Sequence, residues 1–473
     1  MDLTTVAKER ERGSRGADKL RDKKMKLKWR ASSCLPKNSS LVLKLAAVFL
    51  LLGFGFRILF RSYTDSLDRI EAPLMIDRRD IPEPAMTVDA AHPAEEESSL
   101  QSQDQVTVED SLKSLFFDAN AEKCDLFTGD WIPNPSGPIY TNESCPLIES
   151  PQNCMKNGRP DTGYLYWRWN PRSCELPPFD AGRFLELMRN KTWALIGDSI
   201  SRNHVQSVLC MLSTVEKPIE MYHDEEYKSR RWHFPSYNLT ISVVWSPFLV
   251  KAAIFEDMNG VSTSEVKLYL DELDSKWTNM YQNIDYVIIS TGKWFLKSSI
   301  YYENDTILGC HNCDQSRNLT ELRFDFAYEK TLHKVMDFIS NSNHKGSIFF
   351  RTSTPDHFEN GEWHNGGTCP RKAPVKEGEF ELKPVNRVLL EIELREFEKA
   401  RKQAERNGVK LRLLDFTNLS LSRPDGHPGP YRKFQPFARD VNATVQKDCL
   451  HWCLPGPIDA WNDVIMEMVV NAD

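Results

Sequence analysis

The stretch TWALIGDSISRNHVQS, residues 192–207, decides the fold of this chain. It starts as a short apolar run, reaches Gly-Asp-Ser at residues 197–199, and continues at helical spacing. A strand that turns into a helix there exposes a side chain at its carboxyl end and points helix amides toward a bound group. Ser199 therefore has the position of an acyl-transfer nucleophile, because such amides stabilise a tetrahedral oxyanion. The alternative is that Asp198 and Ser199 only cap the helix.

The segments around this stretch alternate between strand and helix patterns. LTISVVWS, YVIISTG, GSIFFRTST and VKLRLLDF are predicted strands. Asp180 is a candidate N-cap for a helix, and Val385–Arg406 is a long predicted helix that ends before Asn407-Gly408. This alternation predicts an α/β fold with a mainly parallel central sheet between helices, and sites in such folds form at the carboxyl ends of strands.

A second signal lies near the C-terminus, in KDCLHWCLPGPIDAWN at residues 447–462. A serine nucleophile needs a base, and that base needs an orienting acid. Asp448 and His451 could supply both from one loop. Cys449 and Cys453 bracket His451, so disulfides there would make the loop rigid. The alternative is a structural histidine buried between two disulfides.

Gly-Asp-Ser at a strand end and a late Asp-x-x-His together resemble serine esterases of the SGNH or GDSL type. The Cys- and Trp-rich block at residues 124–179, RPDGHPGPY at 423–431 and DCLHWCLPGPIDAWN at 448–462 resemble the plant trichome-birefringence-like family of wall polysaccharide O-acetyltransferases. The resemblance covers roughly residues 120–470. It implies an SGNH/GDSL-like sandwich with a Cys-rich N-terminal subdomain, a Golgi location, and acetyl transfer. It also implies Ser199 as nucleophile, His451 as base and Asp448 as orienter.

The chain departs from hydrolytic SGNH enzymes at one strand end. Those enzymes have a Gly-x-Asn-Asp block whose Asn helps to form the oxyanion hole, whereas YVIISTG here continues into Lys293 without an Asn. We expect the amide of Ser199 to act with other donors, and Asp198 is a candidate residue of this oxyanion or substrate site. Arg202 and Asn203 are the nearest candidates, and they could instead be helix-surface residues.

Transfer must outrun hydrolysis, so the acceptor sugar has to be held with water kept away. Sugar sites favour aromatic platforms beside planar polar groups, and Trp452 is favoured because it adjoins His451. The candidate residues for contact with the acceptor sugar are Trp167, Trp169, Trp232, Trp245, Trp294, Trp452, Arg168, Arg423, Asp425 and His427.

The N-terminal part predicts a single-pass type II membrane protein of the Golgi. Residues 1–38 form a basic cytosolic tail, 39–61 a transmembrane signal-anchor, and 62–118 a disordered luminal stem. The Cys-rich subdomain at 119–178 and the SGNH-like catalytic domain at 179–473 are then luminal. A cleaved signal peptide is the alternative, although its apolar and basic regions would be shorter. The net charge of −7 does not indicate a nucleic-acid partner.

Cysteines and glycosylation sequons agree with a secretory compartment. Of 11 cysteines only Cys34 precedes the anchor, and the others suit up to five disulfides. A zinc site would need about four ligands, so we predict no metal site and assign Cys310 and Cys313 to a local disulfide. For the others we hypothesise Cys124–Cys174, Cys145–Cys210, Cys154–Cys453 and Cys369–Cys449. Candidate N-glycosylation sites are Asn142, Asn190, Asn238, Asn304, Asn318, Asn418 and Asn442.

The acceptor expected from the family resemblance is a hemicellulose. RRWHF, VVWSPFLV, YYENDTILGCHNC and RPDGHPGPYR resemble the branch that acts on xyloglucan, which favours its side-chain galactose. Mannan, xylan and pectin stay open, as do an acetylesterase and a non-catalytic polysaccharide-binding protein. No bound cofactor is expected. The acetyl donor would derive from acetyl-CoA on the cytosolic side, which implies a membrane partner that relays acetyl groups.

Overall fold

The computed structural model describes residues 124–256 and 262–471, and a seven-stranded sheet lies at the centre of this part. Its strand order is β13-β12-β9-β3-β6-β5-β4. The first five strands run parallel, and β5 and β4 extend the sheet antiparallel. The mainly parallel sheet predicted from the sequence is thus confirmed. The bounds are β3 Thr192–Gly197, β4 Ile219–His223, β5 Arg230–Phe234, β6 Leu239–Trp245, β9 Tyr286–Ile289, β12 Ser347–Arg351 and β13 Lys410–Leu414.

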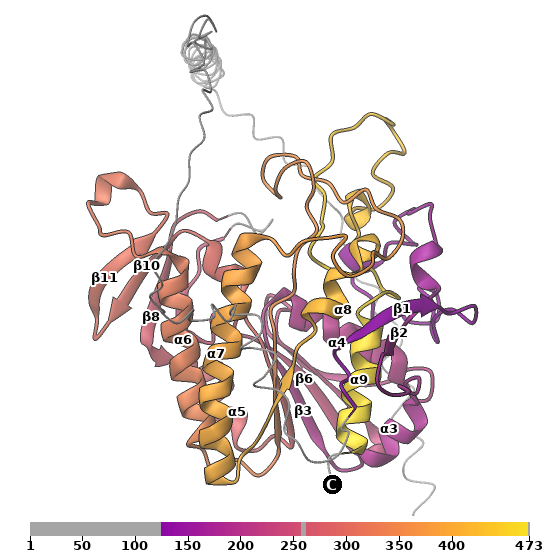
Figure 1. Ribbon diagram of the computed structural model, residues 1–473, viewed down its shortest axis with the longest axis horizontal. Coiled ribbons are helices and arrows are strands. Elements are labelled where there is room, and N and C mark those ends of the chain that lie inside the picture. The colour runs from indigo at the N-terminus through magenta and orange to yellow at the C-terminus, as the bar shows by residue number, and fades with distance from the viewer. Residues whose placement is uncertain (1–123, 257–261, 472–473) are drawn as a thin grey trace, which may run out of the picture. The chain divides into compact units, whose positions relative to one another are not determined.

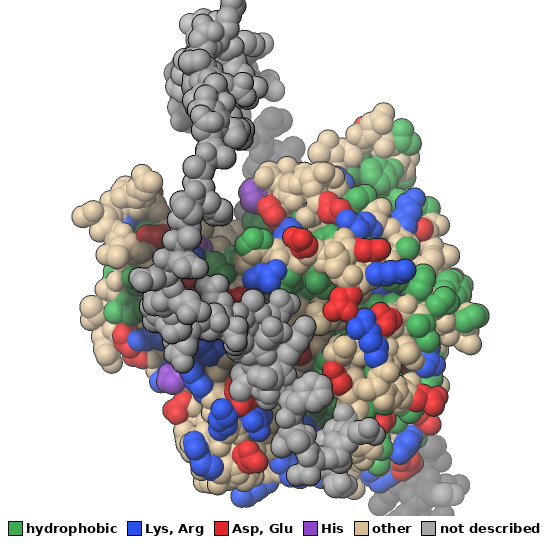
Figure 2. Space-filling view, in the orientation of Figure 1, with side chains coloured by type: hydrophobic (Ala, Val, Ile, Leu, Met, Phe, Trp, Pro, Cys, Tyr) green, Lys and Arg blue, Asp and Glu red, His purple; other side chains and the backbone are tan. Residues whose placement is uncertain are grey.

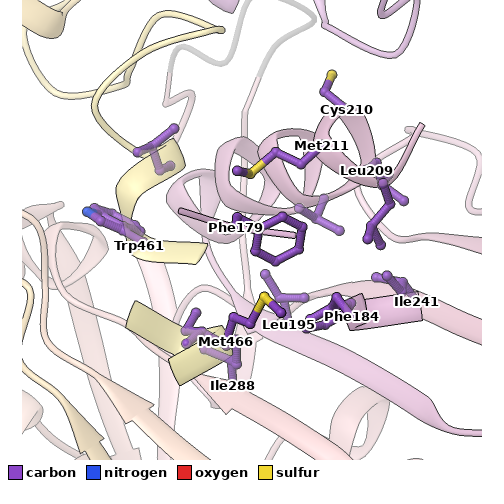
Figure 3. Close-up of a cluster of buried hydrophobic side chains, with 14 of the residues drawn as sticks. Phe179, Phe184, Leu195, Leu209, Cys210, Met211, Ile241, Ile288, Trp461 and Met466 are labelled. Atoms are coloured by element: carbon purple, nitrogen blue, oxygen red, sulfur yellow. The ribbon is translucent and has the colours of Figure 1, made fainter. Parts of the chain in front are cut away.

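Helices cover both faces of this sheet (Figure 1). Successive side chains of a strand point to opposite faces, so Trp193 and Leu195 join one core while Ala194 and Ile196 join the other. Figure 3 shows the first core, where Leu195 and Ile288 of the sheet lie beside Leu209 and Met466. Helices of the first core are α3 Ala181–Leu187, α4 Ser199–Leu212 and α9 Asp459–Val470, and those of the second are α5 Ser275–Tyr281, α6 Arg323–Ser340 and α7 Pro384–Asn407.

Local signals set the ends of two of these helices. Asp180 caps α3 by accepting a hydrogen bond from the backbone N–H of Arg183, as predicted. Gly408 ends α7 with a φ of 69°, a left-handed conformation that glycine adopts without steric cost. The long helix thus extends one residue beyond each of its predicted bounds.

A second, four-stranded sheet was not predicted. Its order is β11-β10-β8-β7, and β8 pairs parallel with β10 while the other pairs are antiparallel. Alternate residues of its strands, such as Leu268 and Leu270 in β8, pack into the second core. The bounds are β7 Val250–Ala253, β8 Val266–Leu273, β10 Ser299–Glu303 and β11 Thr306–His311.

The Cys-rich segment folds around a hairpin of β1 Gly129–Pro133 and β2 Trp167–Pro171. Two 3₁₀ turns, Ser150–Gln152 and Gly163–Leu165, lie between these strands. The remaining short elements, all downstream, are the helix α8 Thr417–Leu421 and the 3₁₀ turns Pro235–Tyr237, Lys293–Leu296, Gln315–Arg317, Pro424–Gly426 and Pro430–Arg432.

Five disulfides hold these segments together, and their pairs are those hypothesised from the sequence. Cys154–Cys453 joins residues 299 apart, so it ties the Cys-rich segment to the loop that follows His451. The others are Cys124–Cys174, Cys145–Cys210, Cys310–Cys313 and Cys369–Cys449. Cys310 and Cys313 are therefore not free to bind zinc. Among the described residues, no cluster of three or more His, Cys, Asp or Glu side chains has metal-binding geometry.

The predicted tail, anchor and stem at 1–38, 39–61 and 62–118 lie outside the described residues. Within the described part, no helix has the length and apolar character needed to cross a bilayer. Of the candidate glycosylation sites, Asn142 is half-buried and the other six are exposed. On the uncovered part of the face in Figure 2, basic and acidic side chains are interspersed.

Candidate active site

Ser199 is the first residue of α4 and directly follows the carboxyl end of β3. Asp198 caps the helix, since its carboxylate accepts the N–H of Ile200 at 2.9 Å. Gly197 has a φ of 153°, and a Cβ there would lie 2.3 Å from the carbonyl oxygen of Ser290 on the neighbouring strand end. Only glycine fits this close approach, so β3 can turn sharply and leave Ser199 half-buried at the helix N-terminus.

His451 and Asp448 form a hydrogen-bonded pair on one loop. Nδ1 of His451 lies 2.9 Å from Oδ2 of Asp448, while Oδ1 accepts the N–H groups of Leu450 and His451 at 3.1 and 3.0 Å. Burial raises the pKa of Asp448, but the charge and hydrogen bonds of His451, with Arg432, hold it well below its ordinary value. The carboxylate is thus ionised and holds Nδ1, which leaves Nε2 of His451 as the nitrogen for a substrate or nucleophile proton.

Asn203 connects the loop of His451 to the helix of Ser199. Its amide donates to the carbonyl of Trp452 at 3.2 Å, and its oxygen accepts the Trp452 N–H at 2.7 Å. His451 also lies close enough to Asp198 for its charge to lower the pKa of that carboxyl, which burial raises overall. Asn203 is fully buried, so it is neither a helix-surface residue nor a free oxyanion donor. It is a positioning residue.

We expect Asn203→Leu to lower kcat about 10- to 100-fold with little change in KM, because a small displacement of the base is costly in rate. The substitution removes both bonds to Trp452 and leaves two buried backbone groups unsatisfied, so Tm should also fall. Steady-state kinetics and thermal denaturation measure both effects. The control is Thr214→Ala, two residues after the end of α4, where the hydroxyl donates only to the nearby carbonyl of Met211. An unchanged kcat in Asn203→Leu would contradict the positioning role of Asn203.

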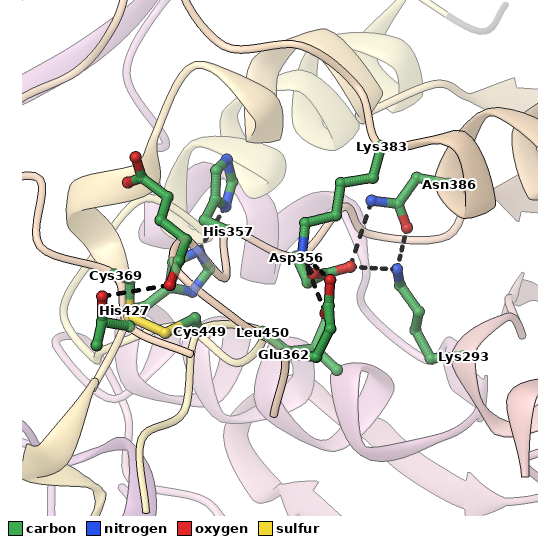
Figure 4. A network of polar contacts seen from close by, with 12 residues as sticks. Lys293, Asp356, His357, Glu362, Cys369, Lys383, Asn386, His427, Cys449 and Leu450 are labelled. Atoms are coloured by element: carbon green, nitrogen blue, oxygen red, sulfur yellow. Dashed lines mark hydrogen bonds and ion pairs between the residues drawn. A yellow bond between two sulfur atoms is a disulfide. The ribbon is translucent and has the colours of Figure 1, made fainter. Parts of the chain in front are cut away.

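Two buried histidines, His427 and His357, support the loop that carries His451. Nδ1 of His427 faces the carbonyl of His451 at 2.7 Å, and its Nε2 lies 2.7 Å from Nδ1 of His357. Nε2 of His357 faces the carbonyl of Leu421 at 2.9 Å. Figure 4 shows the two rings together beside the Cys369–Cys449 disulfide. His357 was missed from the sequence because nothing local marks a lone histidine that contacts residues 64 or more positions away.

Both outer nitrogens of this histidine pair face carbonyl oxygens, so each ring donates outward. Burial lowers the pKa of both rings, whereas nearby carboxylates, Asp356 and Asp425 for His357 and Asp448 for His427, oppose this effect. The pair supports the loop that carries His451, and His427 is buried and not exposed to an acceptor.

Trp452, Arg423 and Asp425 also differ from their expected role as sugar contacts. Trp452 is fully buried and stacks on His427 at 4.3 Å between ring centroids, so no face of its ring is open to a sugar. Arg423 and Asp425 form a buried ion pair at 2.8 Å, and Arg423 also donates to the carbonyl of Tyr164. These residues hold the Cys-rich segment against the catalytic domain.

The remaining aromatic candidates divide by exposure. Trp169 and Trp232 are 2% exposed and serve as core. Trp167, Trp294 and Arg168 are half-buried and keep accessible surface. Trp245 is buried beside Gly197 in the sheet register, and Trp294 meets it edge-on at 5.2 Å.

Arg202 lies on the same side of α4 as Ser199, one turn further along. Its guanidinium stands over Trp245, 5.2 Å from the ring centroid, and its Nε has no hydrogen-bond partner in the described structure. A cationic donor therefore lies close to Ser199. Arg202 stays a candidate for the oxyanion hole, and Trp294 for the acceptor platform.

Polar groups follow the carboxyl ends of β9 and β12. Lys293 bonds to Asn386 and to Asp356, its Nζ 2.5 Å from Oδ1, and Lys383 bonds to the other oxygen of Asp356 (Figure 4). Arg351 bonds to the hydroxyl of Ser290, and its charge lowers the pKa of Asp198. The arginine inside the apolar run GSIFFRTST was an overlooked signal for a buried charge near Asp198.

Comparison with known proteins agrees with this geometry. The PC-Esterase family, described as a GDSL/SGNH-like acyl-esterase family found in Pmr5 and Cas1p, matches residues 176–468, and the PMR5 N-terminal domain matches 122–175. Protein trichome birefringence-like 23 of Arabidopsis thaliana is 54% identical over 448 residues, 94% of this chain and 99% of that protein. Protein trichome birefringence-like 24 of the same plant is 62% identical over 357 residues, 75% and 83% of the two chains. Xyloglucan O-acetyltransferase 1 of Populus trichocarpa is 43% identical over 363 residues, 76% and 83%.

Proposed function

We propose that this chain, which belongs to the trichome birefringence-like group of the GDSL/SGNH-like acyl-esterase family, acetylates a plant cell-wall polysaccharide through Ser199, His451 and Asp448. The observation that carries the mechanism is the pair of hydrogen bonds between Asn203 and the backbone of Trp452. These bonds join the loop of the Asp448–His451 pair to the helix that begins with Ser199. A nucleophile at a helix N-terminus, a base and an orienting carboxylate are the parts that acyl transfer needs.

The reaction proceeds in two steps. Nε2 of His451 takes the proton of Ser199 as its oxygen attacks the donor carbonyl, and return of that proton to the leaving group yields acetyl-serine. His451 then deprotonates a sugar hydroxyl, which attacks the acetyl carbonyl. The proton passes from His451 to the oxygen of Ser199 as the bond between that oxygen and the acetyl carbon breaks. The Ser199 amide and Arg202 are the proposed oxyanion donors, because both lie at the N-terminal turn of α4.

The proposed acceptor is xyloglucan, at a hydroxyl of side-chain galactose. Support comes from the name of the 43% identical Populus relative and from a second xyloglucan O-acetyltransferase, 44% identical over 352 residues. We further propose a type II Golgi protein with its catalytic domain in the lumen, since the predicted anchor precedes all cysteines except Cys34 and all seven candidate glycosylation sites. The acetyl donor derives from acetyl-CoA and reaches the lumen through a membrane partner.

The test incubates the purified chain with an acetyl donor and a panel of xyloglucan, mannan, xylan and pectin oligosaccharides. Mass spectrometry should show net ester gain on xyloglucan oligosaccharides and none with Ser199→Ala. A net loss of ester from acetylated oligosaccharides would instead assign an acetylesterase. Ester gain on another polysaccharide would keep the transferase and replace the acceptor.

A further inference from the structure

A cavity of about 510 Å³ lies outside the proposed active site, between hairpin β1–β2, the segment 374–380 and α8. Its lining combines aromatic with polar side chains and includes none of the three triad residues. Those that matter here are Trp131, Trp167, Phe380, Asn418, Leu421 and Ser422. The volume is in the range of ligand-binding pockets.

Bonds between the three segments make this cavity a built feature. Arg172 of the hairpin side bonds to Asp130 and to Glu377, at 2.9 Å each. The N–H of Val375 donates to the carbonyl of Ser422 at 2.9 Å, which joins the segment 374–380 to the end of α8. Two residues of the wall segment, Val375 and Glu377, are thus attached to other elements that line the cavity.

Asn418 lies in the wall of this cavity and begins the sequon Asn418-Leu419-Ser420. It is exposed, as an attachment residue must be. The indole N–H of Trp131 donates to the carbonyl of Leu419 at 2.9 Å, so an aromatic ring is fixed one residue from the attachment point. Half-buried Trp167 adds a second ring to the same lining. Aromatic rings beside amide and carboxylate groups suit the apolar faces and polar rims of a pyranose.

We propose that the first sugars of an N-linked glycan on Asn418 occupy this cavity. The glycan is transferred from a lipid-linked oligosaccharide: Nδ2 of Asn418 bonds to C1 of the N-acetylglucosamine, the lipid diphosphate leaves, and the amide loses a proton. The inference rests on the luminal location in the proposed function. A tethered sugar has an effective concentration in the millimolar range, so it fills the cavity ahead of a free acceptor.

The glycan stabilises the position of His451 indirectly, through a series of hydrogen bonds that starts at the cavity wall. Leu421 lines the cavity, and its carbonyl holds His357, which contacts His427 and through it the carbonyl of His451. Sugars packed against Leu421 restrict the wall from which this support starts. The cavity then binds the protein's own glycan. The acceptor polysaccharide binds elsewhere, beside Ser199.

The test uses the full chain, produced in plant cells that keep their glycans in high-mannose form and purified in detergent. Peptide mapping gives the occupancy of each sequon. Trimming with endoglycosidase H leaves one sugar per site, whereas peptide N-glycosidase F leaves none. Thermal denaturation and hydrogen exchange at 374–380 are then compared, with Asn418→Gln as the variant and Asn442→Gln, an exposed site absent from the cavity lining, as the matched control.

We expect Asn418 to be occupied, and its loss to lower Tm by roughly 2–4 °C and speed exchange at 374–380. The endoglycosidase-trimmed chain should keep the original Tm, because the first sugar stays in the cavity. Trp167→Ala should lower Tm more in the glycosylated chain than in Asn418→Gln, because only the first chain also loses a contact with the sugar. If Asn418→Gln fails to fold, the enzymatically trimmed chains supply the comparison.

Several results would overturn the inference. A bare Asn418 beside occupied sequons would refute it alone, as would equal Tm and exchange in the Asn418 and Asn442 variants. Oligosaccharide binding that Trp167→Ala abolishes in a chain with bare Asn418 would assign the cavity to the acceptor. Absence of glycan at every sequon would refute the luminal location as well.

Discussion

Ser199→Ala is expected to lower acetyl transfer on the order of 10³-fold or more while the chain stays folded. The substitution removes only the hydroxyl group. The N-terminus of α4 stays capped, because the carboxylate of Asp198 provides the cap. The acetyl group then has no covalent carrier, so both steps of the transfer stop. The measurement is the initial rate of ester formation on oligosaccharide by mass spectrometry.

The covalent step has its own readout. Without acceptor, the unchanged chain should accumulate an acetyl group on the peptide that contains Ser199, and Ser199→Ala should not. Ser213→Ala is the matched control, because this serine caps the opposite end of the same helix and its hydroxyl bonds only locally, to the carbonyl of Leu209. A folded Ser199→Ala chain that kept most of its transferase activity would refute the proposed nucleophile.

The parallel sheet could be predicted because its strands are apolar on both faces. Residues 194–196 alternate between two cores and are all buried, so the run TWALIG carries a strong signal over a short length. The second sheet gave no such signal. Lys267 and Tyr269 of β8 are half-buried and alternate with apolar residues. Its two neighbours in the sheet are β7, which precedes it, and β10, which lies about 30 residues downstream.

The site divides in a similar way. Asp448 and His451 are three residues apart, so their pairing is local and could be predicted from spacing. The bond between Asn203 and Trp452 spans 249 residues, and the contact of His357 with His427 spans 70. Such contacts exist only once the sheet brings strand ends together. Trp452 was assigned to sugar because sequence adjacency to His451 cannot show that the ring turns inward.

Asp448→Asn is expected to lower kcat on the order of 10³-fold with a small effect on KM. The carboxylate accepts the Nδ1–H of His451 and so places the lone pair on Nε2, where the proton of Ser199 must go. An amide NH₂ in its place favours the other tautomer, with the proton already on Nε2. Asp440→Asn, an exposed carboxylate upstream of the same loop, is the control and should leave kcat unchanged.

The same substitution has a pH-dependent effect on stability. The folded pKa of Asp448 lies below its unfolded value of about 3.9. Its contribution is therefore fully present above that value and is lost as pH falls through the folded pKa. The Tm difference between the unchanged chain and Asp448→Asn should be constant near neutral pH and shrink below about pH 4. A kcat within tenfold of the unchanged chain would refute Asp448 as the orienter. A Tm difference that grows in acid would show that Asp448 is not ionised in the folded state.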